Sequence, residues 1–290
     1  MFRKYGGAKR VKDLSGMSQI LFDLKPNRSV SDVFINQEMD LTELVKYVEK
    51  KKAQGENITY FHAFVTAIGK TIYNRPKLNY FVANRHLYEH DKVIISFVAK
   101  VSFDDKSEEM MVMVPIEKDD DINTISKKIT QKLDGFRNKP SGNVAKSGAN
   151  SAIDVLGKLP NFIRIPIIGL FKWTDKKGWL PSSLVEDNLY YSSMIVSNLG
   201  SIDCGAIFHN LADFGNASSL ITMGKIEDAE RIIEGKKSKR KVCNWGMNFD
   251  ERIADGYYFV KAAKTLQYIL DRPELLEEPA SKKVELPELR

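Results

Sequence analysis

Apolar residues recur at helical spacing in several segments of the chain, and each such segment predicts a helix with one buried face. The first segment begins at Asp40, which forms a predicted capping box with Glu43, and it is stopped by Gly55. The second runs from about Thr59 to Pro76, because proline cannot continue a helix. The predicted buried positions of these two helices are Leu41, Leu44, Val45, Val48, Phe61, Phe64, Val65, Ile68 and Ile72.

Two further helices and several strands follow from the same patterning. A helix is expected over residues 119–136, and the last helix follows Gly256 and closes at Pro273. Their predicted buried positions are Ile125, Ile129, Leu133, Phe259, Ala262, Ala263, Leu266, Ile269 and Leu270. Strands are expected at 30–35, 92–103, 110–116, 192–197, 219–226 and 242–249, with a hairpin turn at 104–107. The polar residues after Glu277 are expected to fray.

Residues 138–190 break this pattern. A polar linker begins at Lys139, and an apolar, aromatic stretch follows at 163–173. Pro160 and Pro166 argue against one continuous helix here. The stretch is too short to span a bilayer. It is expected to pack against its own core or a neighbouring subunit, and the alternative is peripheral membrane contact through 160–181, which basic residues flank.

The composition limits the possible functions. The chain has 290 residues, 43% of them hydrophobic and 28% charged, which suits a globular protein with a sizeable core. The start of the chain lacks the apolar core of a signal peptide, and no apolar run is long enough for a membrane span, so a cytoplasmic location is expected. Cys204 and Cys243 lack metal-ligand spacing, and no metal is expected.

The formal net charge of +6 is mild, and part of it lies in the basic run 236–241. Such a run could contact nucleic acid or phosphates. No aromatic platform or binding motif accompanies it, so a solvated hairpin tip after Glu234 and Gly235 is expected, with no nucleic-acid partner.

Residues 250–256, Asp-Glu-Arg-Ile-Ala-Asp-Gly, stand where an apolar run meets the last helix. They resemble the Asp-His-Arg-x-x-Asp-Gly signature of the acyltransferases of 2-oxo acid dehydrogenase complexes, which are relatives of chloramphenicol acetyltransferase. Residues 197–200, Ser-Asn-Leu-Gly, resemble a second motif of that family. Weaker likenesses in the same order lie at 40–44, 75–79 and 113–116.

The resemblance implies an α/β fold, a two-layer sandwich of the CoA-dependent acyltransferase type. It implies a single acyltransferase-like catalytic domain over 1–290 with an atypical insertion at about 138–190. No lipoyl or subunit-binding domain is expected, and therefore no lipoyl group. Acetyl-CoA or another acyl-CoA is the implied co-substrate, with an unknown small-molecule thiol, hydroxyl or amine acceptor. A homotrimer is the implied assembly, with the active site between subunits.

The same resemblance assigns the candidate site residues. Ser197 falls on the position that donates a hydrogen bond to the oxyanion during acyl transfer. Glu251 stands where the family has its catalytic histidine. Asp255 matches an aspartate that organises the base's loop by pairing with arginine, although a helix-capping aspartate explains it equally well. Gly256 is interpreted as a position where the helix start lies close to another backbone.

The exchange at Glu251 leaves the general base open. A histidine has an ordinary pKa of about 6.5, whereas a glutamate titrates at about 4.3 and is a poorer base for a thiol. Burial could raise the pKa of Glu251, and pairing with Arg252 or Arg231 could lower it. His209, in a loop after the second motif, is the best placed of the chain's histidines to substitute, and the alternative is a solvated or hydrogen-bonded loop histidine. A catalytically inactive relative that binds CoA or acyl ligands, or acts as an assembly partner, is the alternative function.

Overall fold

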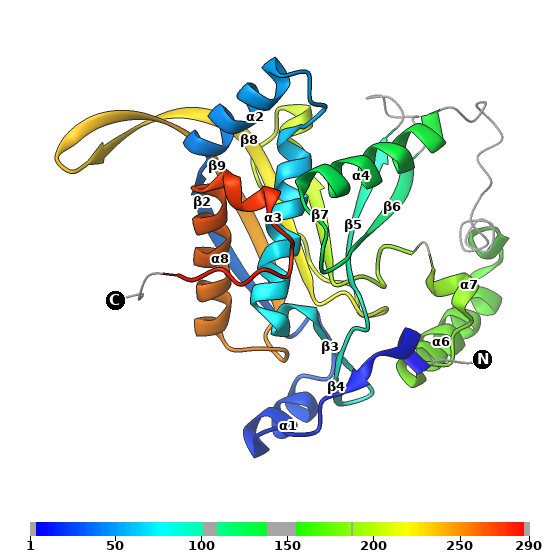
Figure 1. Cartoon of the computed structure of the whole chain (residues 1–290). Helices are drawn as coiled ribbons and strands as arrows, with labels where there is room; N and C mark the ends of the chain where they lie inside the picture. Colours follow the sequence, from blue (N-terminus) through cyan, green and yellow to red (C-terminus); the bar gives the residue numbers. More distant parts are fainter. Residues whose placement is uncertain (1–3, 101–108, 138–154, 187, 287–290) are drawn as a thin grey trace.

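A six-stranded sheet forms the centre of the protein in a computed structural model that describes residues 4–100, 109–137, 155–186 and 188–286 (Figure 1). The strand order is β2-β9-β8-β7-β5-β6. The middle of the sheet is parallel, since β7 runs parallel to both β5 and β8, and the outer pairs are antiparallel. The strands are β2 (Asp32–Asp40), β5 (Val93–Lys100), β6 (Glu109–Ile116), β7 (Met194–Asn198), β8 (Ser219–Ile233) and β9 (Lys236–Asp250).

One face of this sheet is covered by helices α2 (Thr42–Ala53), α3 (Tyr60–Asn74), α4 (Ile122–Arg137) and α8 (Gly256–Leu270) (Figure 1). The predicted apolar positions of these helices lie in the main core, with Phe61 and Leu133 only partly buried. Helix α3 lies between the others and is buried along most of its length. The two-layer α/β fold expected from the sequence is therefore confirmed.

The opposite face of the sheet carries irregular chain instead of helices. Residues 203–218 cross it between the short 3-10 helix η3 (Leu199–Ile202) and β8. A second, smaller cluster of buried apolar residues lies there, made of Leu189, Ile195, Leu211, Ala217 and Leu220. Because neighbouring residues of a strand point to opposite faces, Met194 and Val196 face the helices while Ile195 and Ser197 face this irregular layer.

A second, small sheet was not expected from the sequence. Strands β3 (Tyr80–Ala83) and β4 (His86–Glu89) form a hairpin, and β1 (Lys9–Arg10) pairs with β4. Asn84 and Arg85 adopt positive φ angles of 47° and 60° in its two-residue turn. Helix α1 (Gly16–Leu24) follows β1, and Ser15 caps it by accepting from the Ser18 amide. The strands are too short to show a periodic pattern in the sequence.

The predicted hairpin around the basic run is confirmed, and it is longer than expected. Strands β8 and β9 pair through to Ile233 and Lys236, and the two residues between them, Glu234 and Gly235, have φ angles of 50° and 77°. The run 236–241 forms the first part of β9, in the arm that extends from the body in Figure 1.

Several local predictions were wrong. Helix α6 (Asn161–Lys177) is continuous although Pro166 lies inside it; one missing amide near its start removes a single intrahelical hydrogen bond. At α2 the capping box does not form: Leu41 precedes the helix, and Asp40 accepts from the Thr42 amide and hydroxyl. The tail does not fray after Glu277, because Ala280 is buried and its amide donates to Asp120.

Three further expectations concern the turn at 104–107, the two cysteines and membrane-spanning helices. The hairpin turn predicted at 104–107 lies outside the described residues. Cys204 is exposed and Cys243 is buried, and neither forms a disulfide. Within the described ranges no helix has the length and apolar character needed to cross a bilayer.

Candidate active site

Ser197 lies near the carboxyl end of β7, on the face of the sheet opposite the helices. It is half-buried, and in the described part of the chain its hydroxyl makes no hydrogen bond. The hydroxyl borders a cavity of about 170 Å³. Most of the cavity lining is apolar, with Val98, Leu189, Ile195, Ala212 and Phe214 among the residues that form it. A free hydroxyl beside an apolar hollow is able to donate to a ligand atom placed there.

His209 lines the same cavity from the segment that crosses the sheet. Its ring nitrogen Nδ1 lies 3.0 Å from the Asn210 carbonyl oxygen. A carbonyl oxygen can only accept, so Nδ1 is the donor, and in the neutral tautomer that has its proton on Nδ1 the lone pair is on Nε2. The structure thus places Ser197 and His209, which are twelve residues apart in the sequence, at one cavity.

The segment that carries His209 is held tightly against the sheet. Asn248 on β9 donates from its side-chain amide to the His209 carbonyl oxygen at 2.9 Å, and the Thr222 hydroxyl on β8 donates to the Ile207 carbonyl. A Cβ added to Gly246 would lie 2.3 Å from that Ile207 oxygen, so only glycine leaves room for the crossing chain. The backbone on either side of His209 is therefore fixed by β8 and β9.

Asp32 of β2 also supports this segment. Its carboxylate accepts from the Leu211 amide at 3.4 Å, while its second oxygen is buried without a partner in the described residues. Burial raises the pKa of the Asp32 carboxyl, and the nearby Asn248 side chain and the Leu211 amide oppose this shift. Neither Asp32 nor Asn248 belonged to a recognised motif, and their positions on the open face of the sheet became apparent only from the strand register.

The signature stretch begins with a fully buried ion pair. Asp250 accepts from Arg252 Nε at 2.8 Å and Nη2 at 2.6 Å, and Arg28 Nε lies 4.0 Å from the same carboxylate. Arg252 also donates from Nη1 to the Lys25 carbonyl at 3.0 Å. Burial lowers the pKa of Arg28, which Asp250 opposes. These contacts fix the turn between β9 and α8.

Glu251 points away from that buried pair. Its amide donates to the Ser31 carbonyl at 3.0 Å, and its partly exposed carboxylate forms an ion pair with Lys25. The predicted partners were wrong, because Arg252 binds Asp250 and Arg231 binds the Glu38 carboxylate. Lys25 is more than two hundred residues away in the sequence, so local reading could not have identified it.

Asp255 caps helix α8, accepting from the Tyr258 amide at 2.8 Å. It is exposed, and among the described residues it forms no ion pair with an arginine. Gly256 opens the helix, and a Cβ added there would meet nothing within 4 Å, so the expected close approach to another backbone is absent from the described part of this protomer. The local interpretation of Asp255 as a helix cap is confirmed, and an organising role in catalysis stays a prediction.

Within one protomer Glu251 is remote from Ser197. Ser197 pairs with Thr222, which pairs with Gly246, and Glu251 follows five residues further along that chain. With about 3.3 Å per residue and about 4.8 Å between strands, the two residues are on the order of 20 Å apart. Glu251 does not line the Ser197 cavity.

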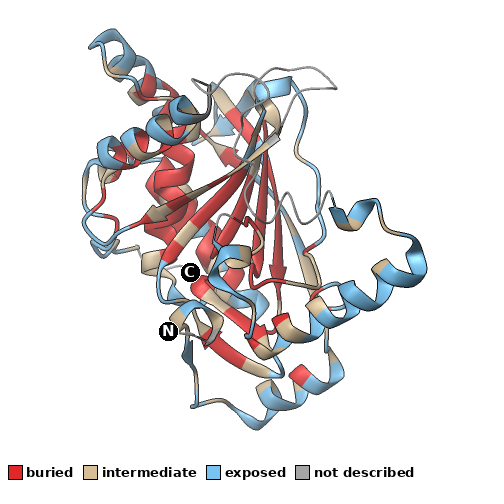
Figure 2. Cartoon of the chain, turned by 90° about the vertical axis from the view of Figure 1, so that its right-hand side faces the viewer, coloured by how far each residue is buried: buried red, intermediate tan, exposed pale blue. Residues whose placement is uncertain are grey.

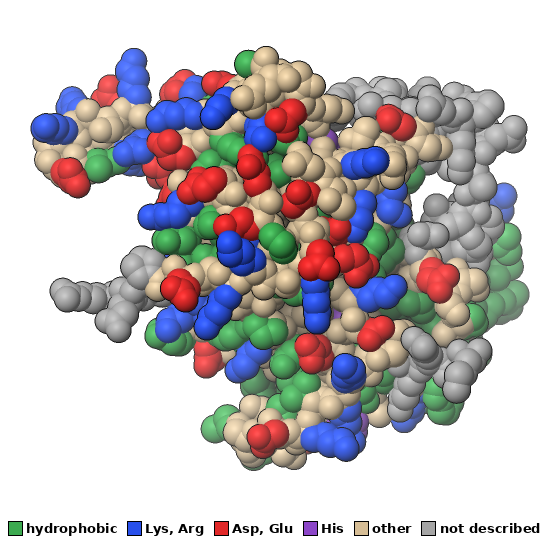
Figure 3. Space-filling view, in the orientation of Figure 1, with side chains coloured by type: hydrophobic (Ala, Val, Ile, Leu, Met, Phe, Trp, Pro, Cys, Tyr) green, Lys and Arg blue, Asp and Glu red, His purple; other side chains and the backbone are tan. Residues whose placement is uncertain are grey.

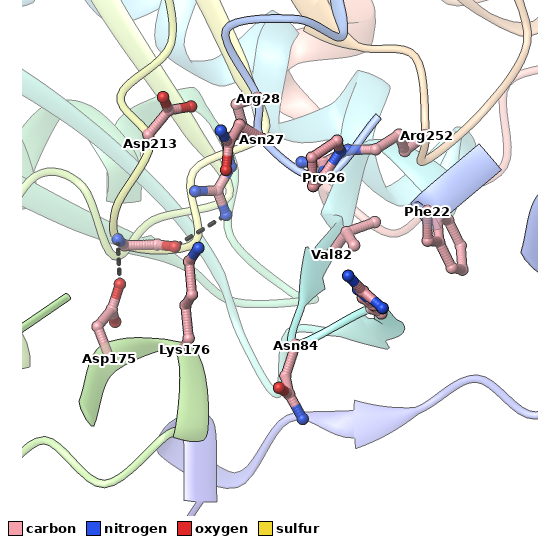
Figure 4. A pocket seen from close by; sticks show the side chains of 12 residues that line it. Phe22, Pro26, Asn27, Arg28, Val82, Asn84, Asp175, Lys176, Asp213 and Arg252 are labelled. Atoms are coloured by element: carbon pink, nitrogen blue, oxygen red, sulfur yellow. Dashed lines mark hydrogen bonds between the residues drawn. The ribbon is translucent and has the colours of Figure 1, made fainter. Parts of the chain in front are cut away.

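A second cavity, of about 160 Å³, lies beside the signature stretch (Figure 4). Arg28 donates to the Gly215 carbonyl at 2.8 Å across its edge, and the Gly215 amide donates to Asp175 at 2.8 Å. Arg252 and Lys176 also contribute to its lining. Arg28 and Arg252 already bind backbone carbonyl oxygens and Asp250. Through Gly215, Arg28 helps to hold in place the segment 203–218, which also reaches the Ser197 cavity. Across the described ranges no group of three or more potential ligand side chains could hold a metal ion.

Comparison with known proteins supports the motif-based resemblance. The family model for the 2-oxoacid dehydrogenases acyltransferase (catalytic domain) matches residues 181–277, a range that contains Ser197, His209, Glu251 and Asp255. A search of curated protein sequences found no match. The domain is therefore of the acyltransferase type over this matched region.

Solved structures share the fold across most of the chain. A probable dihydrolipoamide acetyltransferase from Listeria monocytogenes 4b F2365 is 18% identical with a TM-score of 0.58, covering 91% of this chain and 95% of its own. A chloramphenicol acetyltransferase is 13% identical with a TM-score of 0.55, covering 91% and 99%. A truncated catalytic core of the 2-oxoacid dehydrogenase multienzyme complex from Thermoplasma acidophilum is 15% identical with a TM-score of 0.53, covering 91% and 99%. At these identities the likeness establishes the fold.

Proposed function

We propose that this protein transfers an acyl group from acetyl-CoA or another acyl-CoA to a small thiol, hydroxyl or amine acceptor. The observation that carries the proposal is the pairing of the unbonded Ser197 hydroxyl with His209 at one cavity. The acyltransferase-type family match over the same residues supports it.

In the proposed reaction the acceptor attacks the thioester carbonyl and a general base takes its proton. The carbonyl oxygen becomes an oxyanion, to which the Ser197 hydroxyl donates a hydrogen bond. The tetrahedral intermediate then collapses, the carbon–sulfur bond breaks, and the base returns the proton to the departing CoA thiolate. The reaction therefore needs one oxyanion donor and one group that can accept and release a proton.

His209 is the candidate base that the geometry favours. Its Nδ1–H is occupied by the Asn210 carbonyl, and within the described part of the chain Nε2 has no hydrogen-bond partner. Glu251 is the second candidate. It is too far from Ser197 in the same protomer, so it would have to act on the Ser197 of a neighbouring copy. That arrangement requires an oligomer, and we propose a homotrimer with sites between subunits.

An inactive relative that binds CoA or acyl ligands is the second candidate function. The ion pair between Glu251 and Lys25 favours it, because a carboxylate already neutralised by an ammonium is poorly available as a base. Such a protein would be thermally stabilised by CoA without turning over acetyl-CoA, since a ligand that binds only the folded state raises its stability.

The test measures CoA released from acetyl-CoA against a panel of thiol, alcohol and amine acceptors. His209→Ala is expected to abolish release if His209 is the base, and Glu251→Gln if Glu251 is. His86→Ala is the control, because His86 lies in the small sheet beside Arg10, outside the cavity. Full turnover in both His209→Ala and Glu251→Gln would reject both assignments, and stabilisation by CoA without turnover in the wild type would favour the inactive relative.

A further inference from the structure

Helix α6 is attached to the rest of the molecule mainly through its C-terminal end. Asp175, buried in that end, accepts from the Tyr191 hydroxyl at 2.9 Å and the Gly215 amide at 2.8 Å. The Tyr5 hydroxyl donates to the Lys176 carbonyl, and Phe171 meets Phe214 with ring centroids 6.3 Å apart. The preceding turns lie along the outside of the protein, almost wholly in the exposed colour of Figure 2. Of the two expected ways of packing this stretch, packing against its own core is therefore wrong, and packing against a neighbouring subunit stays a prediction.

These exposed turns are strongly apolar. Phe162, Ile165 and Leu170 are 77%, 64% and 62% exposed. Ile163, Ile167, Ile168 and Trp173 on the same helix, and Trp179 just after it, are exposed as well. A helix that is apolar around much of its circumference is normally buried in a core or in a membrane. Contiguous exposed apolar surface of this kind marks an interaction site.

The exposed charges carried by residues 155–185 themselves are basic, while Asp213 lies near Lys172 and exposed Glu186 follows the segment. The basic residues between 155 and 185 are Lys158, Arg164, Lys172, Lys176 and Lys177. Asp175 is the single acidic residue in that range, and it is buried. On the helical face of the molecule, by contrast, basic and acidic side chains are interspersed (Figure 3). The exposed charges of the α6 region therefore suit an anionic surface.

Two tryptophans complete the pattern. Trp173 and Trp179 are both about half exposed, and their rings meet edge to face with centroids 5.2 Å apart. Tryptophan is enriched at the boundary between lipid chains and water, where its ring is buried and its N–H stays hydrated. Interfacial helices combine this feature with basic residues and large apolar side chains.

We propose that α6 and the adjoining Trp179 bind the surface of a bilayer that contains anionic phospholipid. The helix lies in the interface rather than spanning it, because its 17 residues are fewer than the roughly 20 needed to cross the hydrocarbon core. A second copy of this chain is a poorer occupant. Two identical α6 surfaces facing one another would bring only positive exposed charges together, and like charges repel across an interface.

The experiment is sedimentation of the full-length protein with phosphatidylcholine vesicles and with vesicles containing 30% phosphatidylglycerol, a proportion of about one anionic lipid in three. The wild type is expected to bind the anionic vesicles at least tenfold more strongly, and less so at high salt. The double variant Phe162→Glu, Ile165→Glu is expected to lose this binding. Ile232→Glu is the matched control, because Ile232 is 76% exposed on the β8–β9 hairpin, away from α6.

Tryptophan fluorescence supplies a second measurement. Of the chain's 3 tryptophans, Trp245 is fully buried, so an emission shift on adding vesicles reports Trp173 and Trp179. A blue shift with anionic vesicles, absent from the double variant, is the expected result. Equal binding by the double variant and the wild type, or no binding to anionic vesicles, would overturn the proposal. So would a lipid-free oligomer that the double variant dissociates, because α6 would then be an interface between copies.

Discussion

Asp250 and Arg252, two residues apart, form a buried ion pair through two hydrogen bonds at the junction of β9 and α8. The pair joins the sheet to the last helix, and Arg28 approaches it from the other end of the chain. Glu251 lies between the two residues but faces outward to Lys25. The candidate catalytic position is therefore presented by a turn whose flanking residues are locked in the protein interior.

Replacing Arg252 with leucine should strongly destabilise the fold. It would leave Asp250 with Arg28 at 4.0 Å as its remaining cationic neighbour, and breaking a buried pair in this way costs about 3–5 kcal/mol. Urea denaturation measures the loss. Arg231→Leu is the control, because its ion pair with Glu38 is exposed and such pairs contribute at most about 1 kcal/mol. Similar losses of unfolding free energy in the two variants would show that the buried pair stabilises the fold no more than the exposed pair does.

Ser197→Ala should lower kcat about 10²–10³-fold if the hydroxyl stabilises the oxyanion, because that interaction forms only in the transition state. The KM for acyl-CoA should change little for the same reason. Ser197→Thr should restore most of the rate by retaining a hydroxyl. Ser201→Ala is the matched control, since Ser201 donates to the Asn198 carbonyl on the exposed 3-10 helix. A rate loss shared by Ser201→Ala would indicate disturbance of the strand end.

Gly246→Ala should displace the segment that carries His209. The added Cβ would lie 2.3 Å from the Ile207 oxygen and 2.8 Å from the Thr222 hydroxyl, so backbone must move. Overpacking of this kind costs about 1–3 kcal/mol. Hydrogen exchange of the amides in 204–218 should become faster. Gly205→Ala tests the same segment without strain, because nothing lies within 4 Å of a Cβ there. If hydrogen exchange is unchanged in Gly246→Ala, the added Cβ displaces the strands of the sheet and not the segment that carries His209.

Local sequence patterns correctly predicted those elements that have one face of regularly spaced apolar residues. The apolar stripe of α8 is buried as expected, and α3 begins at Tyr60, next to the start expected at about Thr59. The Ser-Asn-Leu-Gly motif was correctly placed at the end of a strand. In each case the signal lies within a few residues of the structure it predicts.

Long-range contacts account for most of what the sequence did not predict. Lys25 reaches Glu251, and Ala280 pairs with Asp120, across separations that no periodic pattern records. Pro166 does not interrupt α6, because one missing hydrogen bond near a helix start does not end a helix of this length. The crossing of 203–218 over the sheet depends on the neighbouring strands β8 and β9, so His209 could be placed near Ser197 only by resemblance.

The protein should lose stability as the pH falls from about 6.5 toward 3, partly because of His90. Burial of its ring, with Arg28 nearby, lowers the pKa of His90 to about 3, and the nearby Asn216 backbone opposes this shift. Part of His90 is exposed, but its Nε2 atom is buried and has no hydrogen-bond partner among the described residues. Its ring packs on that of Phe81, with the ring centroids 4.6 Å apart.

In this pH window the unfolded chain binds a proton that the folded protein excludes, so acid favours unfolding by up to about 1.4 kcal/mol per pH unit for such a group. Burial also lowers the pKa of His62, so the wild-type slope contains both contributions. His90→Phe keeps an aromatic ring on Phe81 but cannot bind the proton. Urea unfolding free energies measured from pH 7 to 4 should fall less steeply in this variant. An identical slope in the two proteins would show that the His90 ring is protonated in the folded state over this range.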